Sequence, residues 1–122
     1  KSYSVAIQVN SDFAEGYNNR GLSFASVGEH ILAIKDYNDA IYLNSDMANF
    51  YYNLGRSYAA LHEHQMAIES FTESILRDSD STASYYHRGL SYDMLGKFTD
   101  ATLDYRQSCE SNNLRYCSQE SD

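Results

Sequence analysis

Apolar and small residues recur along this chain at the spacing of an α-helix, and the pattern breaks at regular intervals. One run of residues three or four apart goes from Tyr17 through Gly21 to Phe24, and a second begins at Ala33 and continues to Tyr37. Side chains with this spacing share one face of a helix. The two runs together predict a pair of amphipathic helices joined by a short turn.

The predicted helix pair occurs three times with a period of 34 residues. Residues 14–47 share 13 identical positions with residues 48–81 and 10 with residues 82–115. A fixed period of this length is the signature of a repeat architecture. Turns within the units are expected near Gly28, His62 and Gly96. Turns between units are expected at 44–46 and 78–81, where Ser and Asp can cap the following helix.

Glycine recurs inside the first predicted helix of each unit, where it costs about 1 kcal/mol relative to alanine. Alanine recurs at a matching place in each partner helix. We interpret the glycines as points where two helix backbones approach closely, with aromatic side chains filling the space on either side, and not as ligand sites. The residues concerned are Gly21, Gly55 and Gly89, with Ala33, Ala67 and Ala101.

The pattern Tyr-x-x-Arg/Leu-Gly-x-x-Phe/Tyr, followed by Ala-x-x-x-Tyr/Phe-x-x-Ala/Ser, resembles the tetratricopeptide repeat. The resemblance implies an all-α fold, a right-handed α-solenoid of stacked antiparallel helix pairs. It also implies that the chain begins inside a repeat and is a fragment. The expected segments are the second half of a truncated repeat at 1–13, repeat 1 at 14–47, repeat 2 at 48–81, repeat 3 at 82–115, and a capping helix or disordered tail at 116–122.

The linkers between repeats depart from the family pattern, which usually has a proline there. This chain contains no proline and has Ser11, Ser45, Ser79 and Asn113 at those positions. Serine can end a helix pair by capping, but it does not restrict the backbone as proline does. We therefore expect less rigid linkers.

Composition, net charge and the motifs present exclude several classes of partner and of catalytic site. The 122 residues carry a net charge of −8, which repels phosphate backbones, and no stretch is apolar enough to cross a bilayer. We find neither a Gly-rich phosphate loop nor a nucleophile with a plausible base. His30, Glu63 and His64 suit zinc, but His-x-His in a turn is a weak signal. We expect no nucleic-acid partner, no membrane insertion, no enzyme, no cofactor and no metal site.

In the tetratricopeptide repeat family the first helices line a concave groove that receives extended peptides or partner helices. Three arginines and two acids within 14–27, 48–61 and 82–95 sum to +1, which leaves −9 elsewhere. The groove should therefore tolerate an acidic or carboxylate-bearing segment. Helical geometry gives the expected groove residues as Asn18, Asn19, Leu22, Tyr52, Asn53, Arg56, Tyr86, His87 and Leu90.

Two features of this set suit peptide contact. The side chains of Asn19 and Asn53 can bond both the amide and the carbonyl of an extended peptide, while Tyr52 and Tyr86 offer flat amphipathic area. Two plainer alternatives stay open. The patch can be a merely polar solvated face, and the acidity elsewhere can serve solubility alone.

Five positions of the sequence test whether the groove binds one particular kind of peptide, the C-terminal tail of a chaperone. Some family members hold the C-terminal carboxylate of heat-shock chaperones in a clamp of Lys and Asn. This chain has Asn18, Leu22, Asn53, Ala83 and His87 at the matching positions, and only Asn53 matches outright. Without the two lysines the charge-assisted bonds are missing, so we do not expect chaperone-tail binding of that type.

Arg20 and Arg88 are each followed 16 residues later by an acid, Asp36 and Asp104. The two charges disappear together in repeat 2, so we interpret each pair as a contact between the two helices of one repeat and not as an anion site. The corresponding residues of repeat 2 are Leu54 and Ser70.

Cys109 and Cys117 are placed to face one another across a helix-turn-helix, and their spacing resembles the disulfide-stapled helix pairs of Sel-like repeat proteins. A bridge would imply an oxidising compartment, periplasmic or secreted. The alternative is two reduced, small apolar residues in a cytoplasmic protein. Both alternatives stay open.

The sequence thus predicts a protein–protein interaction module that binds an extended peptide or partner segment. The alternative is a structural spacer or self-association segment of a larger repeat protein, with homo-oligomers forming through the truncated edge.

Overall fold

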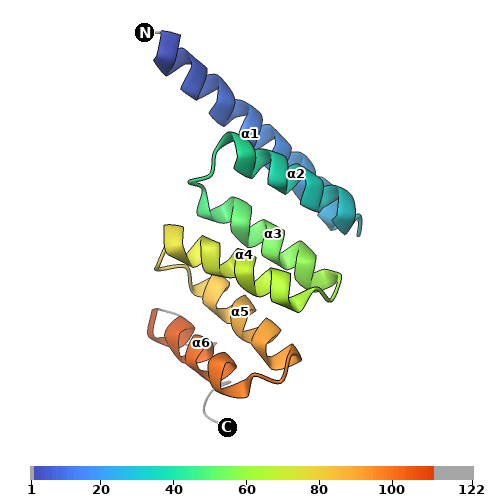
Figure 1. Ribbon diagram of the computed structural model, residues 1–122, viewed down its shortest axis with the longest axis vertical. Coiled ribbons are helices and arrows are strands. Elements are labelled where there is room, and N and C mark those ends of the chain that lie inside the picture. The colour runs from blue at the N-terminus through green and yellow to red at the C-terminus, as the bar shows by residue number, and fades with distance from the viewer. Residues whose placement is uncertain (1, 112–122) are drawn as a thin grey trace.

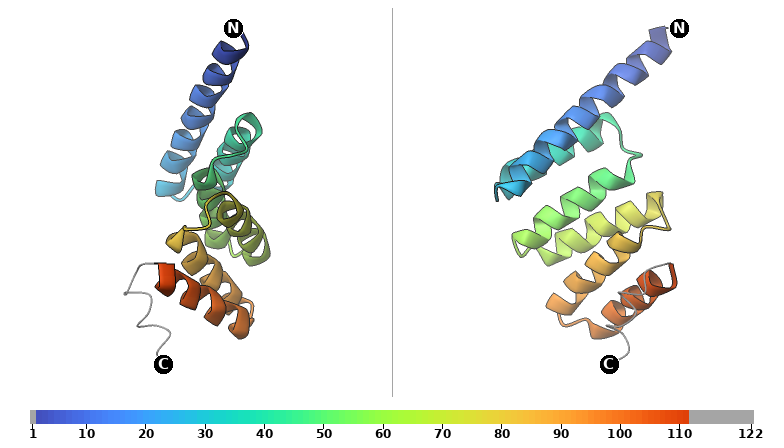
Figure 2. Two further views of the ribbon diagram at one scale, coloured as in Figure 1. Left: turned by 90° about the vertical axis from the view of Figure 1, so that its left-hand side faces the viewer. Right: turned by 180° about the vertical axis from the view of Figure 1, so that it is seen from behind.

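The structure, a computed structural model, describes the backbone of residues 2–111 and the side chains of residues 12–110. This part of the chain folds into helices that stack in chain order (Figures 1 and 2), and it contains no β-strand. The expected all-α class is therefore confirmed. The helices are α1 (Ser2–Ser26), α2 (His30–Leu43), α3 (Ala48–Ala60), α4 (His64–Arg77), α5 (Thr82–Met94) and α6 (Phe98–Ser111).

The stack consists of antiparallel pairs, α1 with α2, α3 with α4 and α5 with α6 (Figure 1). The second helix of each pair packs on the first helix of the next, so α2 contacts α3 and α4 contacts α5. The first helices also contact one another, α1 with α3 and α3 with α5. They therefore share one side of the solenoid, as the resemblance implies.

The turns within the repeats lie where the sequence predicts them. The backbone is left-handed at Gly28, His62 and Gly96, with φ of 85°, 65° and 77°. In each turn the next amide donates a 2.9 Å hydrogen bond to a carbonyl five residues earlier, which ends the first helix. His62 carries a Cβ where the other turns have glycine, so repeat 2 bears a conformational cost of about 1 kcal/mol.

The N-terminal segment differs from the prediction. We expected residues 1–13 to form a separate helix that ends near Ser11, but α1 runs unbroken from Ser2 to Ser26. The sequence contains no proline, and no glycine precedes Gly16. Ser11 and Asp12 lower helix propensity only slightly and do not stop a helix by themselves. The first half of α1 consequently projects beyond α2 (Figure 1).

Each recurring glycine makes room for an aromatic ring of the partner helix. A Cβ built on Gly55 would lie 2.7 Å from a ring carbon of Phe71, whose side chain is fully buried. The helices do approach closely, because a Cβ on Gly21 would also lie 3.2 Å from the Ala33 carbonyl oxygen. The rings lie over the glycines, however, and not on either side of them as we expected. The same overlap joins Gly21 to Tyr37 and Gly89 to Tyr105.

The predicted Arg–Asp contacts are confirmed. Arg20 donates two hydrogen bonds to Asp36, at 2.7 and 2.8 Å, and Arg88 donates two to Asp104, at 2.8 and 2.7 Å. Both carboxylates are buried, so each needs its guanidinium as a partner. In repeat 2 the corresponding Leu54 and Ser70 are also buried, and this contact contains neither charge.

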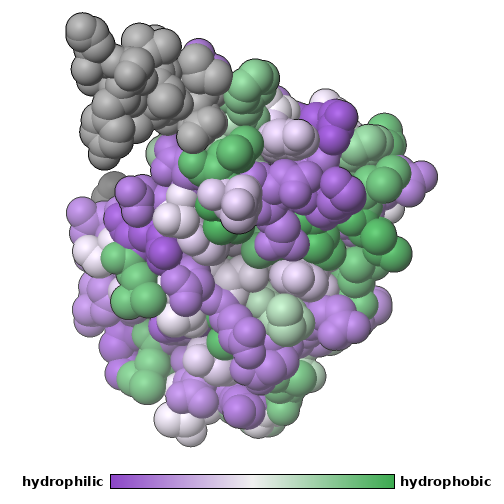
Figure 3. Space-filling model, turned by 45° about the horizontal axis from the view of Figure 1, so that its top comes forward, coloured by the Kyte–Doolittle hydropathy of each residue, from purple (hydrophilic) through white to green (hydrophobic). Residues whose placement is uncertain are grey.

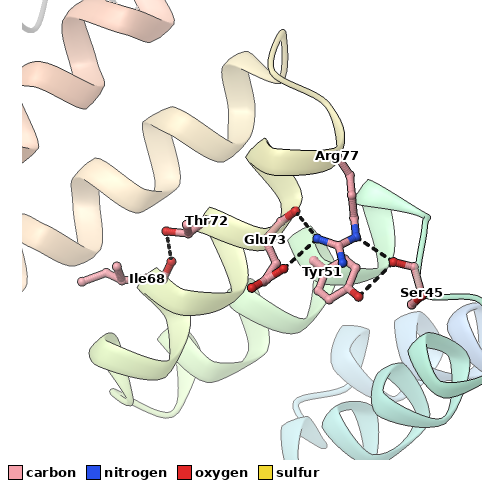
Figure 4. A network of polar contacts seen from close by, with 6 residues as sticks. All are labelled: Ser45, Tyr51, Ile68, Thr72, Glu73 and Arg77. Carbon is pink, nitrogen blue, oxygen red and sulfur yellow. Dashed lines mark hydrogen bonds and ion pairs between the residues drawn. The ribbon is translucent and has the colours of Figure 1, made fainter.

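A cluster of polar contacts holds the linker between repeats 1 and 2, where the family usually has proline (Figure 4). The carbonyl oxygen of Ser45 accepts hydrogen bonds from Arg77 Nε at 2.6 Å and from Tyr51 Oη at 3.0 Å. Arg77 also donates to Glu73 at 2.7 Å and lies 4.2 Å from the centre of the Tyr51 ring. Side chains of α3 and α4 thus restrain a linker that the sequence predicts to be flexible.

Capping by serine occurs at the second linker. Ser81 precedes α5, and its hydroxyl oxygen accepts a hydrogen bond from the Ser84 amide at 3.3 Å. Helix α3 begins after Met47 with no side-chain cap, so the predicted capping is found at only one of the two linkers. Asn44 and Asp78 instead accept bonds from the amides two residues later, which tightens each turn.

Candidate peptide-binding groove

A cavity of about 330 Å³ opens between repeats 1 and 2, bounded by the second half of α1, by α2 and by α3. We call it the repeat 1–2 cavity. Its lining combines small apolar side chains with hydroxyl, amide, imidazole and guanidinium groups. The lining residues are Leu22, Ala25, Ser26, His30, Tyr37, Asn53, Arg56, Ser57 and Ala60.

The polar groups of the cavity are linked across the two repeats. His30 Nδ1 lies 3.2 Å from Ser57 Oγ, and the Asn53 amide nitrogen donates to Asn18 Oδ1 at 2.9 Å. Burial raises the pKa of the Tyr37 phenol. The Arg56 charge and a hydrogen bond with Ser57 lower this pKa, but by less. Tyr37 therefore stays a neutral hydroxyl at physiological pH.

Arg56 differs from the paired arginines of the neighbouring repeats. Its side chain is exposed, and its guanidinium lies 5.6 Å from the centre of the Tyr52 ring. Among the described residues it makes no ion pair, whereas Arg20, Arg77 and Arg88 each bind a carboxylate. Its positive charge is thus available to a ligand at the cavity.

Aromatic side chains continue the groove from the cavity toward repeat 3. The His87 imidazole stacks on Phe71 with ring centres 5.9 Å apart, and it meets Tyr52 and Tyr86 edge-on, each at 5.6 Å. Burial, and secondarily the Arg56 charge, lowers the pKa of His87. His87 is therefore neutral at physiological pH and does not act as a basic clamp residue. We call the rings of Tyr52, Phe71, Tyr86 and His87 the aromatic cluster.

Tyr105 supports the aromatic cluster from α6. Its ring centre lies 5.7 Å from that of Tyr86, and its hydroxyl donates a 2.5 Å hydrogen bond to Asp93. Burial and the hydrogen bond to Asp93 both raise the pKa of the Tyr105 phenol. The short bond ties α5 to α6 beneath the cluster.

The structure distributes the predicted groove residues among several places. Leu22, Asn53 and Arg56 line the cavity, and Tyr52, Tyr86 and His87 lie in the aromatic cluster. Asn19 and Leu90 are exposed outside the cavity lining. Asn18 is only 2% exposed and is bonded to Asn53, so it offers no surface to a ligand. Asn53 therefore pairs with Asn18 and not with Asn19.

Sequence reasoning missed most of the other residues that line the cavity, among them His30, Tyr37, Ser57 and Ala60. His30 was considered only as a metal ligand and Tyr37 only as a packing residue. The available signal was their position in the repeat: Tyr37 adds a hydroxyl where repeat 2 has Phe71. Ala60 had no signal of its own, because it contributes only empty space.

Within the described residues no group of three His, Cys, Asp or Glu side chains is placed to hold a metal ion, and no helix there is long and apolar enough to cross a membrane. Cys109, on α6, is not a free thiol. Cys117 lies outside the described residues, so its pairing with Cys109 stays a prediction.

Several solved structures have a fold similar to that of this chain. The chain is similar to the Arabidopsis OM64 TPR domain, with a TM-score of 0.86, 24% identity, and coverage of 92% of this chain and 94% of that one. It is also similar to the second TPR of Spaghetti (RPAP3) bound to HSP90 peptide SRMEEVD, with a TM-score of 0.83, 25% identity, and coverage of 86% and 97%.

A third similar structure is MamA, with a TM-score of 0.78, 31% identity, and coverage of 80% of this chain and 54% of that one. Comparison with curated protein sequences gave no match. The family profile described as "Tetratricopeptide repeat" matches residues 14–47 and 48–81, the two repeats whose boundaries the sequence predicts and together more than half of the chain. The chain belongs to the tetratricopeptide repeat family.

Proposed function

We propose that this chain is a protein–protein interaction module that binds an extended peptide or partner segment along the groove formed by α1, α3 and α5. The observation that carries this proposal is the repeat 1–2 cavity, to which first-helix side chains Leu22, Asn53 and Arg56 contribute. Membership of the family supports it, and so does the similar Spaghetti domain, which is bound to an HSP90 peptide.

The surroundings of Arg56 favour an acidic partner segment. The first helices sum to +1 in a chain of net charge −8, but two of their three arginines are already neutralised by Asp36 and Asp104. The positive potential that a ligand would experience is therefore confined to the neighbourhood of Arg56. The half-buried rings of Tyr52 and Tyr86 offer amphipathic area beside it.

Chaperone tails of the kind bound by the Spaghetti domain are not the partner that we propose. The five clamp positions of this chain hold no lysine, Asn18 is buried, and His87 has a lowered pKa. A C-terminal carboxylate at that place would meet no full positive charge. The partner is instead a segment whose acidic group reaches Arg56.

A peptide-library screen on the whole chain, read by fluorescence polarisation, tests the module. Tyr52→Ala and Leu22→Ala alter the groove, and each has a matched control on a second helix, Tyr42→Ala (87% exposed, α2) and Leu76→Ala (72% exposed, α4). We expect the groove variants to weaken binding by about 10-fold, the usual effect of truncating an anchor. Equal affinity of all four variants for the selected peptides would remove the proposed groove.

Self-association is the second candidate, favoured by apolar side chains at the turns that join paired helices. Val27, Ile31, Met94 and Phe98 are each more than 60% exposed. Figure 3 shows apolar residues gathered on the right, the side on which Figure 1 shows the α1–α2 and α3–α4 turns. Sedimentation velocity over a range of concentrations tests this candidate, and a strictly monomeric chain would contradict it.

Catalysis is not part of the proposed function. The pair that most resembles a catalytic dyad is His30 and Ser57, at 3.2 Å. Among the described residues no carboxylate is hydrogen-bonded to His30, so nothing there orients the imidazole as a general base. We assign the pair to the wall of the cavity.

A further inference from the structure

The two junctions between repeats are built from equivalent helices but carry different side chains. At the repeat 2–3 junction, His87 and Met94 occupy the positions that Asn53 and Ala60 hold at the repeat 1–2 junction. The His87 ring fills its junction by stacking on Phe71 and meeting Tyr52 edge-on. Asn53 is smaller than His87, which leaves space at the repeat 1–2 junction, whereas Met94 is 63% exposed and does not fill the other junction.

The cavity also gains polarity at two positions where the other junction is apolar. Tyr37 has a hydroxyl where repeat 2 has Phe71, and Arg56 has a guanidinium where repeat 3 has Leu90. Phe71 and Leu90 show that the repeat packs without either group. The hydroxyl and the charge are thus additions that packing does not require, and both face the same hollow.

None of the described residues that line the cavity is acidic. The Ser57 hydroxyl is already engaged with Tyr37 and His30, so the groups left to donate to a ligand are the Arg56 guanidinium and the second amide hydrogen of Asn53. The exposed Arg56 guanidinium lies 5.6 Å from the centre of the Tyr52 ring and makes no ion pair with a described residue, so it can donate to a ligand. A planar anion fits the N–H edge of a guanidinium with two parallel hydrogen bonds.

We propose that the repeat 1–2 cavity binds a single carboxylate of the partner segment, with Arg56 as its charged receptor and the Asn53 amide as a neutral donor beside it. This rests on the proposed function. The carboxylate is either an Asp or Glu side chain within the segment or its C-terminus. The site differs from the five-position clamp, with which it shares only Leu22 and Asn53.

Small carboxylates test the cavity directly, without a peptide. The isotope-labelled 122-residue chain is titrated with N-acetylglutamate α-amide, which presents a side-chain carboxylate, and with N-acetylglycine, which presents a terminal one. N-acetylglutamine amide is the neutral control. We expect saturable NMR shifts at the Arg56 Nε–H and the Ser57 amide with at least one carboxylate, and the stronger one identifies the source. No saturable shift at Arg56, or equal shifts with the neutral probe, would overturn the proposal.

Three variants locate the effect. Arg56→Gln removes the receptor, and we expect at least a 10-fold loss of probe affinity, as for the loss of a charged hydrogen-bond partner. Asn53→His copies His87, whose ring fills the other junction, and it keeps the Arg56 charge, so it should also abolish saturation. Lys35→Gln removes one positive charge from an exposed side chain of α2 that does not line the cavity, so the probe affinity should not change. Equal losses for Lys35→Gln and Arg56→Gln would reduce the effect to general electrostatics.

The outcomes separate this proposal from the module itself. Library peptides that bind the groove with no preference for acids, together with probes that leave Arg56 unshifted, would refute the carboxylate site and leave the module intact. Probes that saturate the cavity, with no library peptide bound, would support the site and refute peptide binding.

Discussion

Replacing Gly55 with alanine tests the steric role of the recurring glycines. A helix normally gains about 1 kcal/mol from this change, because alanine loses less backbone entropy. Here the new Cβ would lie 2.7, 2.8 and 2.9 Å from three ring atoms of Phe71, a side chain with no exposed surface. Overpacking of this kind costs about 1 to 3 kcal/mol. We expect the two effects together to destabilise the chain by about 1 kcal/mol.

The matched control is Gly16→Ala in α1. Gly16 is helical and exposed, and a Cβ there would meet nothing within 4 Å. It should therefore gain the full propensity term of about 1 kcal/mol. The difference between the two variants, about 2 kcal/mol, is large enough to measure by urea unfolding followed by circular dichroism.

A second substitution separates overpacking from other causes. Phe71→Leu removes the ring that overlaps the new Cβ, so Gly55→Ala should cost at least 1 kcal/mol less in a Phe71→Leu background, as a double-mutant cycle would show. The steric explanation fails if Gly55→Ala stabilises the chain as much as Gly16→Ala does, or if the cycle shows no coupling.

Three further predictions concern charge and redox state. Arg88→Leu alone should lower the free energy of unfolding by about 3 kcal/mol, because it leaves the buried Asp104 without a partner. Adding Asp104→Ser should restore most of this loss, because repeat 2 has Leu and Ser at the same two positions. Equal losses for the single and the double variant would contradict the pairing. The lowered pKa of His87 means that the folded state binds its proton less readily than the unfolded state, so stability should fall as pH drops below about 6.5. An NMR titration midpoint of His87 above 6.5 would oppose this. A thiol assay under denaturing, non-reducing conditions should find no free thiol; two would show that Cys109 and Cys117 are unpaired.

The packing of the repeats was predictable because the sequence states each contact three times. The glycine, the aromatic residue of the partner helix and the turn recur with a 34-residue period, so no single position had to be interpreted alone, although the recurrence did not show that the ring lies over the glycine. The unbroken α1 was not predictable in this way. A helix end at Ser11 depends on tertiary packing more than on the residue itself, and serine does not force a stop.

The cavity was only partly predictable. Helical periodicity selected Leu22, Asn53 and Arg56 because they point away from the core. It could not show that the space beside them is empty, since that depends on how the side chains of α1, α2 and α3 pack together. Nor could it show that Asn18 turns inward to Asn53, because two amides can satisfy each other as readily as they bind a peptide.

The Ser45 linker has a consequence for the order of assembly. A proline restricts its linker from the moment of synthesis, in the unfolded chain as well as in the folded one. The bond from Arg77 to Ser45 joins residues 32 apart, so it forms only after α3 and α4 have folded and brought the last residue of α4 back to the linker. The unfolded chain thus keeps the full freedom of this linker, and the bond that restrains it is available only once repeat 2 is complete.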